Sequence, residues 1–136
     1  MTPAQKALVQ ASFKDVMAIR DAAAALFYGR LFEIDPALRP LFKGDIEQQG
    51  RLLMAMIGTA VAGLDDLDAL VSAVRALGVR HKRYGVTDKD YDTVATALLW
   101  TLERGLGDGF TPAVKDAWAA VYGVLAATMR QAAAAA

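Results

Sequence analysis

The chain has 136 residues, a length typical of one domain with a sizeable core, and hydrophobic residues make up 55% of it. Its 15 basic and 15 acidic residues cancel, so no net charge attracts nucleic acid or an anionic membrane surface. The absence of cysteine excludes disulfides, thiolate zinc sites and iron–sulfur clusters, and charge or glycine interrupts every long apolar stretch, so we expect one cytoplasmic domain over residues 1–136 with no membrane segment.

Helical signals begin at the first residues and continue through the first third of the chain. The pattern TPAQ at residues 2–5 forms a capping box that predicts a helix to about Arg20. Apolar residues at helical spacing then continue until Asp35 and Pro36, which predict a short helix through Leu41. Alanine runs and scarce β-branched clusters favour helices over strands, so the fold class is all-α.

The rest of the chain predicts three further long helices and a final one. The segment LDDLDALVSAVRALGVRHKR begins with aspartates and ends with cations, the order that the helix macrodipole favours. The expected boundaries lie near Gly63, Gly85, Thr87, Gly105 and Thr111. Thr87 with Asp90 forms another capping box, and Gly85 is a candidate C-terminal cap. The sequence therefore predicts six longer helices and one short one.

His81 is the only histidine, and it lies in the last turns of a predicted helix beside Arg80, Lys82 and Arg83. A lone histidine in such a run is most often solvated, because basic residues collect at helix C-termini. Zinc sites, nucleophilic triads and acid–base pairs need several such groups gathered together, so one histidine without cysteine rules out most of these sites. Haem iron needs only one axial nitrogen from the protein, because the porphyrin supplies four. This stretch alone leaves both interpretations open.

Five motifs follow one another along the chain. They are LFYGRLFEIDPALRPLF (26–42), QQGRLLMAMIG (48–58), LGVRHKRYGV (77–86), Tyr91 and AWAAVYGVLA (117–126). In order and spacing they resemble the globin family, and in particular the flavohaemoglobin-like branch of bacterial single-domain haemoglobins. The resemblance covers essentially the whole chain. It implies a globin fold, a three-on-three helical sandwich around haem b (iron protoporphyrin IX) held noncovalently.

The resemblance implies a role for eight residues. It makes His81 the proximal iron ligand and places Tyr28 and Gln49 over the open iron position. There a phenol donor would stabilise bound dioxygen by roughly 1.5 to 3 kcal/mol. The residues expected to line or contact the haem are Phe42, Leu53, Leu77, His81, Val86 and Tyr91. Without the resemblance, most of these positions would be interpreted as ordinary core.

Tyr91 matches a tyrosine that, in flavohaemoglobins, joins a glutamate of the final helix in a network around the proximal histidine. Such a network strengthens imidazole donation to iron. This chain has alanine, at about Ala133, where that glutamate would be. We therefore expect the network to be incomplete.

The function implied by the resemblance is reversible binding of dioxygen, carbon monoxide and nitric oxide. Nitric oxide dioxygenation, with Tyr28 and Gln49 as its catalytic residues, would need a separate reductase, because no flavin or nicotinamide domain follows. Oxygen storage or delivery and a globin-fold signalling module are the alternatives, although a module that had lost haem should lack His81 or Phe42. No nucleic acid or membrane partner is expected.

Overall fold

The computed structural model describes every residue from Met1 to Ala136 and has no β-strand. Its α-helices are α1 (Pro3–Ala18), α2 (Arg20–Ile34), α3 (Ile46–Ala62), α4 (Leu67–Arg83), α5 (Asp88–Leu106) and α6 (Pro112–Ala135). Its 3₁₀ segments are η1 (Pro36–Leu41), η2 (Gly63–Asp65) and η3 (Gly107–Gly109). The predicted all-α fold is confirmed, whereas η2 and η3 were not predicted. None of the helices combines the length and the apolar character needed to cross a membrane.

The helix ends lie where the capping residues predict them. Thr2 Oγ1 accepts a hydrogen bond from the Gln5 backbone N–H at 3.1 Å, and Gln5 Oε1 accepts one from the Thr2 N–H at 2.9 Å. Before α5, Asp90 Oδ2 accepts a hydrogen bond from the Thr87 backbone N–H at 2.9 Å. Gly85 follows α4 with a φ of 91°, a conformation that favours glycine. Both capping boxes and the glycine cap are confirmed.

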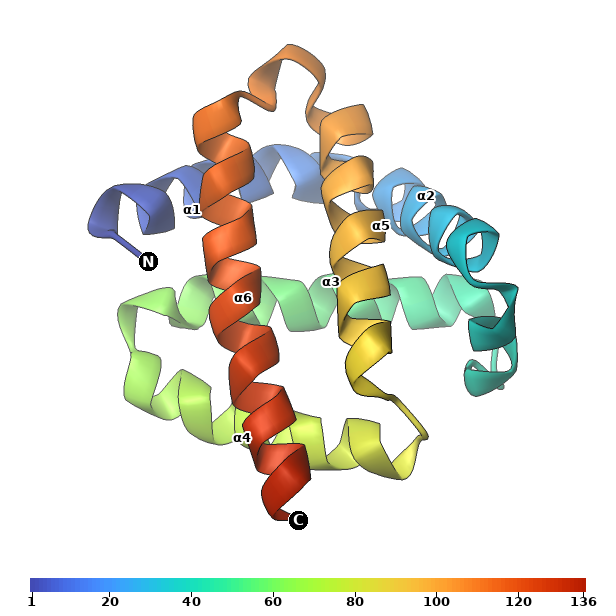
Figure 1. Ribbon diagram of the computed structural model, residues 1–136. Helices are drawn as coiled ribbons and strands as arrows, with labels where there is room; N and C mark the ends of the chain where they lie inside the picture. Colours follow the sequence, from blue (N-terminus) through green and yellow to red (C-terminus); the bar gives the residue numbers. More distant parts are fainter.

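Helices α5 and α6 lie side by side and cross α1, α3 and α4 (Figure 1). Helix α6 packs along α1 and α4, while α2 packs against α3 and α5. The larger core draws on all six α-helices and on η2, and it includes Val9, Leu64 and Trp118. A smaller core lies where α2, η1 and α5 meet, and it consists of Phe27, Tyr28, Leu31, Leu38 and Ala97. This smaller core positions the first part of the candidate site.

Candidate functional site

Tyr28 lies in the smaller core, and its side chain is only 3% exposed. Its ring stacks on Phe32 with centroids 5.9 Å apart and meets Phe42 edge-on at 5.3 Å. Burial raises the pKa of the Tyr28 phenol, and the polar Gln49 side chain nearby partly lowers it. The phenol is therefore protonated at neutral pH and has a hydroxyl to donate.

A close crossing of α2 and α3 brings Tyr28 and Gln49 together. An ideal Cβ on Gly50 would lie 2.8 Å from the Ala24 Cβ, closer than side chains approach one another. Ala24 is one turn before Tyr28 on α2, and Gly50 directly follows Gln49 on α3. This crossing was not predicted, although an isolated glycine inside a helical pattern is the signal that could have indicated it.

Phe42 and Leu53 add apolar surface beside Tyr28. Phe42 directly follows η1, Leu53 lies one turn after Gln49 on α3, and both are half-buried and pack against the smaller core. Val94 and Leu98 reach the same core from α5. Four of the predicted residues thus lie in one region: Tyr28, Gln49, Phe42 and Leu53. The side chains of Phe42 and Leu53 are partly exposed there.

His81 lies in the last turn of α4 and is half-buried, whereas Arg80, Lys82 and Arg83 are exposed. Its Nδ1 lies 2.9 Å from the Leu77 carbonyl oxygen, which assigns the ring proton to Nδ1 and leaves a lone pair on Nε2. Burial lowers the pKa of His81; the hydrogen bond to Leu77 raises it and the Arg80 charge lowers it. A neutral imidazole with Nε2 free is the form that ligates a metal.

The turn that follows His81 and α4 packs beside the end of η1. Leu77 and Val86 are half-buried, and the Val86 backbone N–H donates a hydrogen bond to the His81 carbonyl oxygen at 3.0 Å. A Cβ on Gly85 would lie 3.7 Å from Leu41 Cδ2, so this turn runs beside the end of η1. The His81 end of α4 and the smaller core therefore border the same region of the molecule.

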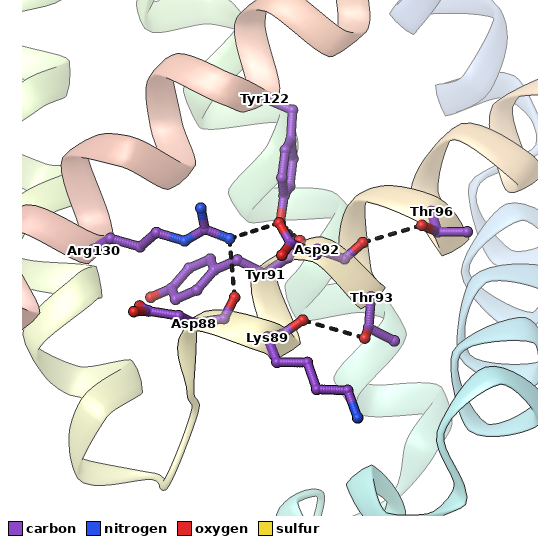
Figure 2. Close-up of polar contacts among 8 residues, drawn as sticks. All are labelled: Asp88, Lys89, Tyr91, Asp92, Thr93, Thr96, Tyr122 and Arg130. Atoms are coloured by element: carbon purple, nitrogen blue, oxygen red, sulfur yellow. Dashed lines mark hydrogen bonds and ion pairs between the residues drawn. The ribbon is translucent and has the colours of Figure 1, made fainter.

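Tyr91 lies in the first turn of α5 within a polar network, which Figure 2 shows. The Arg130 guanidinium lies 5.1 Å from the Tyr91 ring centroid and donates hydrogen bonds to Asp88 O and Asp92 Oδ1, each at 2.9 Å. The Tyr122 hydroxyl donates to the Tyr91 carbonyl oxygen at 2.7 Å. Arg130 and Tyr122 come from α6, and no local signal in the sequence could have predicted these long-range contacts.

The residues around Tyr91 include no carboxylate from α6. The only acidic residue of α6 is Asp116, and Ala133 offers its backbone oxygen, which accepts a hydrogen bond from Lys82 Nζ at 3.1 Å. Burial raises the pKa of Tyr91, the Arg130 charge lowers it and the Asp88 charge raises it. A cation from α6 therefore lies on the Tyr91 ring, although the resemblance led us to expect only a missing anion.

The His81 end of α4 offers one free imidazole nitrogen, and the smaller core offers one phenol and one amide beside apolar side chains. No group of three or more His, Cys, Asp or Glu side chains could hold a metal ion. A metal bound by His81 would therefore need its remaining ligands from a cofactor. The arrangement suits binding of a small polar molecule near a singly ligated metal.

Comparisons with known proteins identify the family of this chain. The family model described as Globin matches residues 25–129, well over half of the chain. The chain is similar to neuroglobin-1 of Oncorhynchus mykiss, with 29% identity over 95% of this chain and 90% of the relative. It is 28% identical to neuroglobin-2 of the same species, with the same coverage, and 28% identical to a neuroglobin of Chaenocephalus aceratus over 93% of this chain and 88% of the relative. The helical architecture is the globin fold, and the chain belongs to the globin family.

Proposed function

We propose that the chain, as one globin domain over residues 1–136, binds haem b and a diatomic gas, with His81 as the iron ligand. Membership in the globin family supports haem-based gas binding. The observation that carries the residue assignment is the half-buried His81 ring, with its proton held on Nδ1 by Leu77 and its Nε2 free. Noncovalent attachment is favoured because the chain has no cysteine for a thioether link.

The surroundings of His81 and Tyr28 suit a flat, largely apolar cofactor. Half-buried apolar side chains border the region from η1, α3, α4 and the turn before α5; these are Phe42, Leu53, Leu77 and Val86. The porphyrin supplies four nitrogens and requires one from the protein, which agrees with a single histidine. When bound, haem supplies the iron at which a gas ligand attaches. Tyr91 borders the cofactor from α5 in this proposal.

Tyr28 and Gln49 supply hydrogen-bond donors for the gas. The Tyr28 hydroxyl remains protonated because burial raises the pKa of the phenol, so it can donate to a ligand with partial negative charge. Contacts with Phe32 and Phe42 fix the ring, and Gln49 approaches the phenol from α3. Dioxygen gains more from such donors than carbon monoxide, because it is more polar when bound. The pocket should therefore retain dioxygen.

Nitric oxide dioxygenation is the activity that we propose beyond gas binding, in the flavohaemoglobin-like branch that Tyr28 and Gln49 indicate. Haem would supply the redox chemistry of this reaction, and the role of Tyr28 and Gln49 would be to hold and orient dioxygen through hydrogen bonds. Each turnover consumes one electron, so a separate reductase is the implied partner. Storage or delivery of dioxygen is the alternative, and it consumes no electrons. Nitrate formation from nitric oxide under a steady supply of reductant distinguishes the two.

The role of His81 is tested by His81→Ala, with Arg83→Ala as the control for loss of an exposed neighbour. We expect the parent and Arg83→Ala to retain stoichiometric haem by pyridine haemochrome assay. His81→Ala should lose haem retention, because no second histidine can replace the ligand. Stoichiometric haem with an unchanged ferrous carbonyl spectrum in His81→Ala would contradict the assignment.

A further inference from the structure

Helices α4 and α6 touch at the backbone close to His81. A Cβ on Gly78 would lie 2.5 Å from the Met129 carbonyl oxygen and 2.6 Å from the Met129 Cα. Both are backbone atoms, so no side-chain rotation could relieve the overlap. Gly78 is buried and lies three residues before His81 on α4. Any other residue at position 78 would force α4 away from α6.

A second contact between the same helices lies one turn further along. Lys82 follows Gly78 by four residues and so lies on the same face of α4. Its Nζ donates hydrogen bonds to the Ala133 carbonyl oxygen at 3.1 Å and to the Ala136 backbone oxygen at 3.2 Å, and Ala133 is one turn after Met129 on α6. The Ala133 carbonyl oxygen also accepts a hydrogen bond from the Ala136 backbone N–H at 3.3 Å, so the lysine adds a second donor to this carbonyl. Two successive turns of α4 are tied to two successive turns of α6.

Helix α4 has little other support near His81. Its extensive packing is along α6, and its further packing is against η2, which precedes its first residue. Figure 1 shows α6 crossing α4, with the end of α6 beyond the crossing. The position of the His81 backbone therefore depends on the separation between α4 and α6.

We propose that Gly78 and Lys82 are positioning residues for His81. The glycine sets the separation of α4 from α6 through a rigid backbone contact, and the lysine maintains the alignment of the two helices by its hydrogen bonds. Together they fix where the imidazole meets the iron. This inference rests on the proposed role of His81 as the iron ligand.

The iron–histidine stretching band in resonance Raman spectra tests the inference. The band is recorded on reduced protein after photolysis of carbon monoxide, so that His81 is the only protein ligand sampled. The samples are the parent, Gly78→Ala, Lys82→Met and, as a control, Gly123→Ala. Gly123 is also a helical glycine, on α6, but a Cβ there would meet nothing within 4 Å. Lys82→Met keeps most of the side-chain length and removes both hydrogen bonds of the ammonium group.

We expect Gly78→Ala to shift the band to lower frequency, because a displaced α4 strains the bond between imidazole and iron. Lys82→Met should shift it in the same direction by a smaller amount, and Gly123→Ala should leave it unchanged. A lowered melting temperature with an unshifted band in either folded variant assigns a purely structural role and overturns the inference. If Gly78→Ala does not fold, the band of Lys82→Met alone decides.

The proposed function fails in a different way. A parent protein that binds haem but shows no iron–histidine band contradicts His81 as the ligand, and it overturns the positioning role together with the proposed function. A parent with the band, and variants whose bands match it, contradicts only the positioning role. The two failures are therefore distinguishable within one set of spectra.

Discussion

The Arg130 guanidinium lies 5.1 Å from the ring centroid of Tyr91, and in Figure 2 the ring lies between Arg130 and Asp88. The same guanidinium donates hydrogen bonds to Asp88 O and Asp92 Oδ1, so one side chain of α6 contacts three residues at the start of α5. A cation over the ring face attracts the negative π surface and also favours a phenolate. The environment of Tyr91 is therefore cationic on the side of α6.

Replacing Arg130 with methionine keeps a long side chain and removes the charge. We expect the pKa of Tyr91 to rise further above its ordinary value, because burial raises it and Arg130 opposes that rise. A pH titration of ¹³C-labelled tyrosine by NMR measures the change. Lys115→Met, an exposed substitution near the start of α6, is the control. An unchanged or lowered pKa for Tyr91 would show that Arg130 does not act on the phenol.

Buried tyrosines predict a loss of stability in alkali. Burial raises the pKa of Tyr122 far above its ordinary value, and burial also raises the pKa of Tyr28 and Tyr91. Tyrosine in an unfolded chain ionises near pH 10, so above about pH 10 the unfolded state loses protons that the folded state keeps. The free energy of unfolding should therefore be constant below about pH 10 with respect to these groups and decrease as the pH rises further.

The variant Tyr122→Phe separates the effect of phenol ionisation on stability from the contribution of ring packing. The variant loses the hydrogen bond to the Tyr91 carbonyl oxygen, which should cost about 0.5–1.5 kcal/mol at neutral pH. Its stability should then decrease less steeply in alkali than that of the parent, because one of the buried phenols is gone. Urea unfolding at neutral pH measures the loss of the hydrogen bond, and urea unfolding above pH 10 measures the decrease of stability in alkali. Parallel decreases in the parent and the variant would assign the alkaline loss to other groups.

The helix boundaries could be predicted because their signals are local. Thr2 with Gln5 and Thr87 with Asp90 are capping pairs within one turn, and Gly85 has a positive φ just after Tyr84, the C-cap of α4. The segments η2 and η3 have three residues each, too short for any period in the sequence to indicate them.

The site could be predicted only where a motif or a local contact defines it. His81 and Leu77 are four residues apart on one helix, so their hydrogen bond follows from helix geometry. The pairing of Tyr28 with Gln49 instead depends on the crossing of α2 and α3, and only the family resemblance implied it. Arg130 reaches Asp92 across 38 residues, a contact that no periodic pattern encodes.

The crossing of α2 and α3 can be tested by adding one methyl group. Gly50→Ala places a Cβ 2.8 Å from the rigid Ala24 Cβ, so we expect a loss of stability of about 1–3 kcal/mol from overpacking. The second substitution Ala24→Gly, in the double variant, should restore much of this loss by making room. Gly29→Ala is the control, since a Cβ there meets nothing within 4 Å and should stabilise α2 by about 0.5–1 kcal/mol.

Chemical denaturation of the parent and these three variants gives their free energies of unfolding. A Gly50→Ala variant as stable as Gly29→Ala would show that α2 and α3 separate without cost. A double variant less stable than Gly50→Ala alone would show that the contact with Ala24 is not the source of the strain. In either case the approach of Tyr28 to Gln49 would need another explanation.

Tyr28 is the residue on which retention of dioxygen mainly depends. Tyr28→Phe keeps the ring and its contacts with Phe32 and Phe42, so packing should change little. Loss of one hydrogen bond of roughly 1.5 to 3 kcal/mol should raise the dissociation rate of dioxygen by about tenfold to somewhat over a hundredfold. Carbon monoxide, which is less polar when bound, should respond much less.

Stopped-flow measurement of both dissociation rates compares the parent, Tyr28→Phe and the control Tyr84→Phe, whose tyrosine is 63% exposed. Small and equal changes for the two gases would place the Tyr28 hydroxyl beyond the reach of the ligand, and Gln49 would then be the only donor left to retain dioxygen.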